Sequence, residues 1–401
     1  MTFFERGSRE YRNACISLFL AGFVSFATLY ATQPILPILS MDFHISAAAS
    51  SLTLSLSTMA LAVGMLFAAP LSDTIGQKQI MILSMIITSI LGLATAFSPN
   101  YVTLIVLRGI LGLAVAGVPA IAMAYTSEEF HPSGLGKIMG LYIAGTSIGG
   151  MAGRILTGIL TDLFSWRVAL ATLGIIAILM SLLFWRLLPS PVHHRKQSFQ
   201  WKPALQAYKI HLDNKSLIPL LCMGFVLMGG YVTLYNYVGF MLMEPPYNLS
   251  QTVIGFLFLV NLGGAYSSMY MGKKADHYGR PLILKISLCI MICGAILTLI
   301  PNFIIKLLGI SVFTFGFFGS HSVASSWVGA RADVNKSQAS SLYLLLYYVG
   351  SSIVGSIGGI FWTDYKWPGV ILLIVCILLC GYPLIFAAYK KYQSSPRLGH
   401  R

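Results

Sequence analysis

The strongest constraint on this chain is a series of twelve apolar stretches, each about as long as a membrane-spanning helix. They begin near Ala14, Ala49, Gln79, Tyr101, Ile138, Trp166, Leu217, Thr252, Leu282, Ile304, Ala339 and Trp367. A helix needs roughly 20 apolar residues to cross the hydrocarbon core of a bilayer. Charged residues make up only 9% of the chain, whereas a soluble domain carries about 25%. The sequence therefore predicts an all-α membrane protein with twelve transmembrane helices.

The formal net charge of +14 is distributed unevenly between the two sides of this predicted topology. Of the 26 Lys and Arg residues, 21 fall in the termini and in the connections on the same side as the termini. Three lie on the opposite side and two, Arg108 and Arg154, lie inside spans. Loops rich in Lys and Arg stay in the cytoplasm. We therefore expect a multi-pass protein of the cytoplasmic membrane, with both termini in the cytoplasm, contacts to membrane lipid and no nucleic-acid partner.

The most charged connection divides the chain into two sets of six spans. It occupies residues 189–216, contains several Lys, Arg, His and Pro residues and is predicted to be a cytoplasmic linker. The predicted domains are accordingly an N-terminal six-helix bundle at residues 1–188 and a C-terminal six-helix bundle at residues 217–401.

The two predicted bundles repeat each other in sequence. Thr28–Tyr30 returns as Thr233–Tyr235, and the Asp and Gly of Asp73–Gly76 return in Asp276–Gly279, at nearly constant offsets. Because six is an even number of crossings, both repeats enter the membrane from the same side. A parallel repeat about an axis along the membrane normal is typical of two-bundle transporters with a central binding site.

The connection between the second and third spans carries a recognisable motif. Residues 69–78 resemble the signature Gly-x-Leu-x-Asp-Arg-x-Gly-Arg-Lys of the major facilitator superfamily, and residues 272–280 are a weaker second copy. The resemblance covers essentially the whole chain and implies the major facilitator fold. It implies a conformational gate made by Asp73, Gly76, Lys78, Asp276, Gly279 and Arg280. Thr74 and Gln77 replace two arginines of the signature, so we expect a weaker latch than is usual in the family.

Motifs in other spans narrow the resemblance. Leu107–Gly112 resembles the family's Arg-x-x-x-Gly signature, and Gly145–Arg154 is similar to the glycine-rich signature of exporters, without its usual Gly-Pro pair. The alternative for the glycines is close packing of helix backbones. Together with Gln33–Pro37 and Ser320–Trp327, these segments resemble the YnfM-type inner-membrane transport proteins. That branch is grouped with proton-linked efflux carriers, which implies export by rocker-switch alternating access and names no substrate.

Few ionisable residues lie at predicted helix centres. All twelve acidic residues fall in loops, termini or helix ends, which leaves Arg108, Arg154 and His321 in the core. A charge inside the membrane is costly and by default suggests function. Arg108 either binds Gln33 or helix carbonyls near Pro34, as a structural residue, or contacts ligand directly. Guanidinium groups suit a carboxylate or a phosphate, so the arginines can attract an anionic ligand.

His321 is the candidate for proton coupling. It is the core residue whose ordinary pKa lies within the working pH range. The alternative is a histidine that is simply hydrogen-bonded inside the bundle. Glu128 and Glu129, at the predicted cytoplasmic end of the fourth span, are the nearest acidic alternatives.

The predicted substrate cavity follows from the family resemblance, which assigns its lining to the first, fourth, seventh and tenth spans. Aromatic walls with few polar groups suit an amphipathic organic molecule. The predicted substrate-binding residues are Tyr30, Gln33, Arg108, Arg154, Tyr235, Asn236, Tyr237 and Asn261.

These observations predict a secondary active transporter that moves a small amphiphilic or anionic organic molecule by alternating access, as proton-coupled efflux. The alternatives are an importer of a small organic anion and, from another class, a membrane-embedded sensor or enzyme. No Gly-Lys-Ser/Thr nucleotide-binding motif is present, which excludes ATP hydrolysis as the source of energy. We expect a monomer that is not an enzyme, binds no metal or cofactor and uses an ion gradient, with protons as the first candidate. The six cysteines lie in apolar segments, and their spacing is not that of a metal site.

Overall fold

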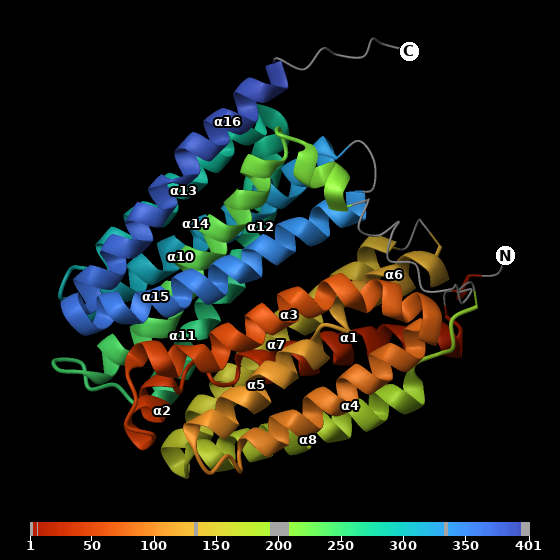
Figure 1. Ribbon diagram of the computed structural model, residues 1–401, viewed down its shortest axis with the longest axis horizontal. Coiled ribbons are helices and arrows are strands. Elements are labelled where there is room, and N and C mark those ends of the chain that lie inside the picture. The colour runs from red at the N-terminus through yellow and green to blue at the C-terminus, as the bar shows by residue number, and fades with distance from the viewer. Residues whose placement is uncertain (1–2, 6, 132–134, 193–207, 333–335, 394–401) are drawn as a thin grey trace. The chain divides into compact units, whose positions relative to one another are not determined.

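The computed structural model describes residues 3–5, 7–131, 135–192, 208–332 and 336–393. The described residues form helices and no strands. Their helices are α1 (Arg9–Tyr30), α2 (Leu36–Asp42), α3 (Ala47–Ile75), α4 (Gln77–Thr95), α5 (Tyr101–Val115), α6 (Pro119–Glu129), α7 (Leu135–Leu163), α8 (Trp166–Leu187), α10 (Ile218–Met243), α11 (Gln251–Leu257), η2 (Phe258–Val260), α12 (Asn261–Tyr278), α13 (Arg280–Leu297), α14 (Phe303–Arg331), α15 (Lys336–Leu379) and α16 (Gly381–Gln393). Figure 1 shows these helices, coloured in their order along the chain from red to blue.

These helices account for the twelve predicted spans. Within the part of the chain that the structure describes, ten helical regions are long and apolar enough to cross a membrane. The fourth predicted span is divided into α5 and α6 before Pro119. The last candidate region contains two predicted spans, which meet at Lys366, where the backbone is non-helical with φ 54°. The prediction of an all-α, twelve-span membrane protein is confirmed.

Several helices start at a polar residue that caps the first turn. The first backbone N–H groups of a helix have no partner inside the helix, and a Ser or Asn side chain at the N-cap accepts from one of them. The capping residues with such a hydrogen bond are Ser8, Ser46, Asn100, Ser165, Ser250 and Asn302. These caps fix where the apolar segments begin.

The chain divides into two compact units. Unit 1 comprises residues 1–201 and 242–258, and unit 2 comprises residues 202–241 and 259–401. Residues 242–258, which the sequence assigns to the C-terminal bundle, belong to unit 1 because they include α11, which packs on α7. The predicted linker, residues 189–216, lies partly outside the described residues.

Unit 1 is built around the close contact of α1 and α7. A Cβ atom at Gly145, Gly149 or Gly153 would lie under 3.0 Å from the backbone of Phe19, Phe23 or Ala27, respectively. Glycines spaced by four residues therefore form a groove on α7 into which the α1 backbone fits. This geometry supports the packing alternative for the glycine-rich segment.

Unit 2 repeats elements of this design. Gly350 of α15 lies against the backbone of Phe225 of α10 in the same way. Gly279, between α12 and α13, adopts φ 91° and ψ 138°, and Gly76, between α3 and α4, adopts φ 116° and ψ 138°. Residues with a side chain rarely adopt such positive φ values, whereas glycine adopts them readily. Glycine therefore permits these sharp turns between helices. The turn predicted at Gly76 and its repeat are thus present in the backbone.

Candidate functional site

In unit 1, Arg154 lies at the centre of a buried cluster. Its side chain on α7 is only 5% exposed. Its Nε donates to Oε1 of Gln33 over 2.9 Å, and its Nη1 donates to the Gly150 carbonyl over 2.9 Å. The guanidinium carbon lies 4.1 Å from the ring centre of Tyr30 and 4.5 Å from that of Phe258. We call Tyr30, Gln33, Arg154 and Phe258 the Arg154 cluster.

The backbone around this cluster brings its members together. α1 ends at Tyr30, so Gln33 lies in the turn before α2. α11 approaches α7 closely because both carry glycine: a Cβ at Gly255 would lie 3.1 Å from the Arg154 carbonyl oxygen. Phe258, which follows α11, thereby reaches the guanidinium. A cation between aromatic faces is favoured by the ring quadrupoles, and more so when it is shielded from water.

Arg108 has a different environment, although it is equally buried, with 1% exposure. On α5, it donates to three backbone carbonyls, those of Thr53 (2.9 Å), Thr28 (2.9 Å) and Leu29. Pro34 has no N–H, and the Gln33 N–H donates to the Tyr30 carbonyl instead of that of Leu29. Arg108 thus binds carbonyls at the frayed end of α1, and Gln33 bonds Arg154 rather than Arg108. This geometry supports the structural alternative for Arg108.

In unit 2, His321 lies on α14 among aromatic rings. Its Nδ1 lies 2.9 Å from the Tyr343 hydroxyl, and the tautomer decides which atom donates. The imidazole centre is 4.8 Å from the ring centre of Tyr347 and 6.0 Å from that of Phe317, to which it is nearly parallel. The histidine is therefore held in one orientation by a hydroxyl and by stacked rings.

A polar group on α10 and α12 continues this arrangement. The hydroxyls of Tyr231 and Tyr235 both donate to Oδ1 of Asn261, over 3.0 and 3.3 Å. The Tyr235 hydroxyl also lies 2.7 Å from that of Thr314. Tyr231 stacks on Phe317, with ring centres 3.9 Å apart. The unit 2 aromatic cluster therefore comprises Tyr231, Tyr235, Asn261, Thr314, Phe317, His321, Tyr343 and Tyr347.

Two further predicted substrate-binding residues, Asn236 and Tyr237, lie next to each other on α10. Tyr237 is fully buried and its hydroxyl donates to the Gly355 carbonyl over 2.7 Å, which ties α10 to α15. Asn236 is buried on α10. The bond of Tyr237 to a backbone carbonyl gives it a packing role.

The predicted gate is described in part. Asp73 lies in the last turn of α3, and its side chain is outside the described residues. Lys78 donates to the Ser190 hydroxyl over 3.4 Å. Gln77, which replaces a signature arginine, is buried and donates to the Glu128 carboxylate over 3.0 Å. Asp276 is exposed near the end of α12.

Asp162 is a contact residue that the sequence analysis did not single out as part of the site. Its carboxylate accepts from the backbone N–H groups of Gln251 (3.0 Å) and Thr252 (2.6 Å). It thus caps the N-terminus of α11 from α7, where a negative charge is favoured. Its position at a helix end was evident in the sequence, but its partner was not.

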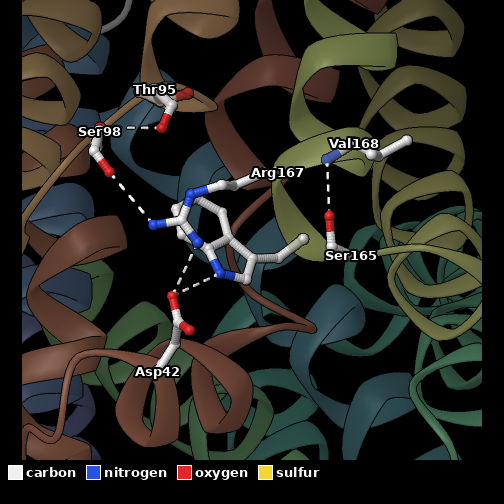
Figure 2. A network of polar contacts seen from close by, with 7 residues as sticks. Asp42, Thr95, Ser98, Ser165, Arg167 and Val168 are labelled. Atoms are coloured by element: carbon white, nitrogen blue, oxygen red, sulfur yellow. Dashed lines mark hydrogen bonds and ion pairs between the residues drawn. The ribbon is translucent and has the colours of Figure 1, made fainter.

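A second polar network in unit 1 joins α2 to α8 (Figure 2). Asp42 accepts from Nη1 of Arg167 and from Nε1 of Trp166, both over 3.0 Å. Arg167 also donates to the Ser98 carbonyl over 3.4 Å and covers the Trp166 ring at 4.2 Å. The Asp42 and Arg167 side chains are both exposed to solvent. Such an exposed ion pair contributes little to stability, and here it joins the ends of α2 and α8.

Four aromatic residues that the sequence analysis missed, Tyr231, Phe317, Tyr343 and Tyr347, had a recognisable signal, because each is paired with another ring. Tyr231 and Tyr235, Phe317 and His321, and Tyr343 and Tyr347 are each four residues apart. Such pairs lie on one face of a helix. Three helices with such a pair indicate a shared aromatic surface, whereas Phe258 and Thr314 had no such signal.

Comparisons with known proteins agree with this fold and these helices. The Major Facilitator Superfamily profile matches residues 18–354. The chain therefore belongs to the Major Facilitator Superfamily and is a multi-pass membrane protein of a transporter family.

Its relatives are similar over nearly the whole chain. The uncharacterized MFS-type transporter YybF of Bacillus subtilis (strain 168) is 44% identical over 95% of this chain and 96% of its own length. The inner membrane transport protein YnfM of Escherichia coli (strain K12) is 44% identical over 94% and 92%, respectively. A crystal structure of a bacterial homologue of the human lysosomal transporter Spinster superposes with a TM-score of 0.76 at 14% identity, covering 98% of this chain and all of that chain. The predicted family and its YnfM-type branch are thereby confirmed.

Proposed function

We propose that this protein is a secondary active transporter that exports a small amphiphilic organic molecule bearing an anionic group, in exchange for protons. The observation that carries the proposal is the Arg154 cluster, in which a buried guanidinium lies between two aromatic rings. The family supports transport itself, and the cluster supports the substrate class.

The cluster combines the two features that such a substrate requires. A guanidinium supplies charge and several donors for a carboxylate or a phosphate. Tyr30 and Phe258 supply apolar faces for the rest of an amphiphilic molecule. Of the predicted substrate-binding residues, we assign direct contact to Tyr30, Gln33 and Arg154, and we assign Arg108 to holding the end of α1.

Proton coupling is assigned to His321 in unit 2. The residue is the core side chain with an ordinary pKa near neutrality. Its Tyr343 hydroxyl partner, 2.9 Å away, can donate to or accept from the ring as its protonation changes. The rings of Phe317, Tyr343 and Tyr347 around His321 provide an apolar surface that a substrate can contact.

The proposal also covers the location of the protein and the direction of transport. The protein works in the cytoplasmic membrane as a monomer, with both termini in the cytoplasm and without a cofactor. Export is supported by the relationship to the YnfM-type branch. Import of the same organic anion remains the alternative, because the Arg154 cluster suits an anion whichever way it moves.

The substrate class is tested by transport into proteoliposomes with a panel of amphiphilic organic acids, cations and neutral molecules. Wild-type protein is expected to move acids, and Arg154→Gln to lose at least about tenfold of that activity, the size of one charge-assisted contact. Arg154→Lys, which keeps the charge but not the planar fork, is the matched variant and is expected to retain part of it. Unchanged transport of acids by Arg154→Gln, at equal protein content, would contradict the assignment.

A further inference from the structure

Unit 2 contains a cavity whose lining residues belong to neither the Arg154 cluster nor the unit 2 aromatic cluster, although one of them, Arg280, is a predicted gate residue. Its volume is about 210 Å³, and it lies where the N-terminus of α13, the C-terminal end of α14 and α16 meet. Its described lining residues are Arg280, Pro281, Trp327, Ala330, Arg331 and Tyr389. Two of these six side chains are cationic and none is a carboxylate. The cavity is therefore electropositive.

Arg280 is the residue that most directly indicates a ligand. It is the first residue of α13, and the Gly279 turn fixes its position at the cavity. Its Nε is buried and has no hydrogen-bond partner among the described residues. A buried donor of a charged group without a partner is costly. An anion in the cavity would satisfy this donor.

Arg331 brings a second guanidinium to the same cavity. It ends α14, and its Nη2 donates to the Ala388 carbonyl of α16 over 3.0 Å. Its guanidinium carbon lies 5.6 Å from the Trp327 ring centre. These contacts hold the group at the cavity wall, so the lining includes a second guanidinium. An anion in the cavity is attracted by both positive charges.

The backbone adds to the positive potential. α13 begins at the cavity, and no side chain caps its first turn. A helix N-terminus carries a partial positive charge that favours phosphate. Pro281 has no N–H, so the backbone donors of this turn are those of Arg280 and Leu282. The cavity thus combines an uncapped helix N-terminus with two guanidinium groups.

We propose that this cavity binds a phosphate group. Two arginine forks with a helix N-terminus suit its several acceptor oxygens and its negative charge. The group can come from an anionic phospholipid or from a soluble phosphate compound, because both present the same oxygens. Trp327 and Tyr389, the latter 44% exposed, are of the residue types that lie at the headgroup level of a bilayer. In the predicted topology this end of unit 2 faces the cytoplasmic leaflet, where anionic lipids are found.

The test measures binding to the purified full chain in a neutral detergent. Native mass spectrometry would quantify bound phosphatidylglycerol against phosphatidylcholine, and thermal unfolding would be followed with added inorganic phosphate. Arg280→Gln is expected to weaken binding by about tenfold, as expected for one charge-assisted contact. Lys285→Gln is the matched control, because Lys285 is an exposed cation on the same helix that does not line the cavity.

A second variant distinguishes the effect of the cavity's space from the effect of its charge. Ala330→Trp fills the space while both arginines remain, and it is expected to weaken binding to a similar extent as Arg280→Gln. Binding of phosphatidylglycerol but not of inorganic phosphate would identify a lipid site. Binding of inorganic phosphate alone would identify a soluble ligand, and both results support the proposal. It would be overturned if neither probe bound, or if Lys285→Gln weakened binding as much as Arg280→Gln.

Discussion

At the scale of residues, two buried arginines with similar exposure have different partners. Arg108 donates to backbone carbonyls of α1 and α3, whereas Arg154 bonds a side-chain amide and a carbonyl and lies against aromatic rings. Backbone carbonyls do not move without moving a helix. We therefore expect Arg108 to support the fold and Arg154 to support recognition.

Substitution of Arg108 tests the first half of this contrast. Arg108→Leu removes these donors from the Thr28, Leu29 and Thr53 carbonyls, and a buried acceptor left without a partner typically costs about 1–3 kcal/mol. We expect a large fall in thermal stability in detergent and little folded protein in the membrane. Arg154→Leu is the comparison, and a larger loss of stability in that variant would contradict the assignment.

Substitution of His321 tests the coupling residue. His321→Gln preserves a polar side chain of similar reach to Tyr343 but cannot bind a proton near neutral pH. Substrate exchange without a proton gradient is expected to continue, while substrate accumulation driven by a gradient is expected to fall to background. Both are measured in the same proteoliposomes. Full gradient-driven accumulation by this variant would show that His321 is structural.

At the scale of helices, close backbone contact determines which elements pack together. α7 presents glycines to α1, and α11 meets α7 across Gly158, where a Cβ would lie 2.5 Å from the Gln251 carbonyl oxygen. Each contact leaves no room for a side chain. Unit 1 therefore depends on small residues in the way that membrane helices generally do.

The α1–α7 contact can be tested with two glycines of one helix. Gly149→Ala would place a Cβ under 3.0 Å from the Phe23 backbone, whereas a Cβ at Gly140 would meet nothing within 4 Å. Overpacking typically costs about 1–3 kcal/mol. We expect Gly149→Ala to lower the unfolding temperature in detergent and Gly140→Ala to leave it unchanged or slightly raised. Equal effects of the two would argue against the packing account.

The Asp162 cap of α11 gives a second prediction at this scale. A negative charge at a helix N-terminus typically contributes about 0.3–1 kcal/mol. Asp162→Ala is therefore expected to destabilise α11 by that order, while the Ser250 N-cap remains. Hydrogen exchange at Gln251 and Thr252 should then increase. Asp364 follows Thr363 as Asp162 follows Thr161, and it lies in α15. Asp364→Ala is therefore the matched control and should leave this exchange unchanged. Unaltered exchange in Asp162→Ala would show that the cap is unimportant.

The elements show what could be predicted from sequence and what could not. The spans were predictable because the bilayer sets their length, and the turns were predictable because Gly76 and Gly279 take φ values that favour glycine. The partners were not, because sequence gives depth along a helix but not the direction that a side chain faces. Thus Arg108 was expected to bond either Gln33 or carbonyls of the first span, and it bonds the carbonyls, whereas Gln33 bonds Arg154. The packing of α11 on α7 had no local signal.

At the scale of the whole molecule, the sequence and the comparisons identify a transporter, and its mechanism is the proposal. The family is shared with the relatives described above. The proposed substrate class depends on the Arg154 cluster and the proposed energy source on His321. The second of these proposals requires that movement of an organic molecule be linked to movement of protons.

The most direct test is substrate-dependent proton movement in proteoliposomes. Wild-type protein would be reconstituted in liposomes that contain a pH-sensitive dye, a pH gradient would be imposed, and amphiphilic acids would be added one at a time. The proposal predicts that transported acids collapse the gradient faster than in protein-free liposomes loaded with the same acids. Movement of labelled acid without any protein-dependent change in pH would contradict proton coupling and show a carrier that works by another means.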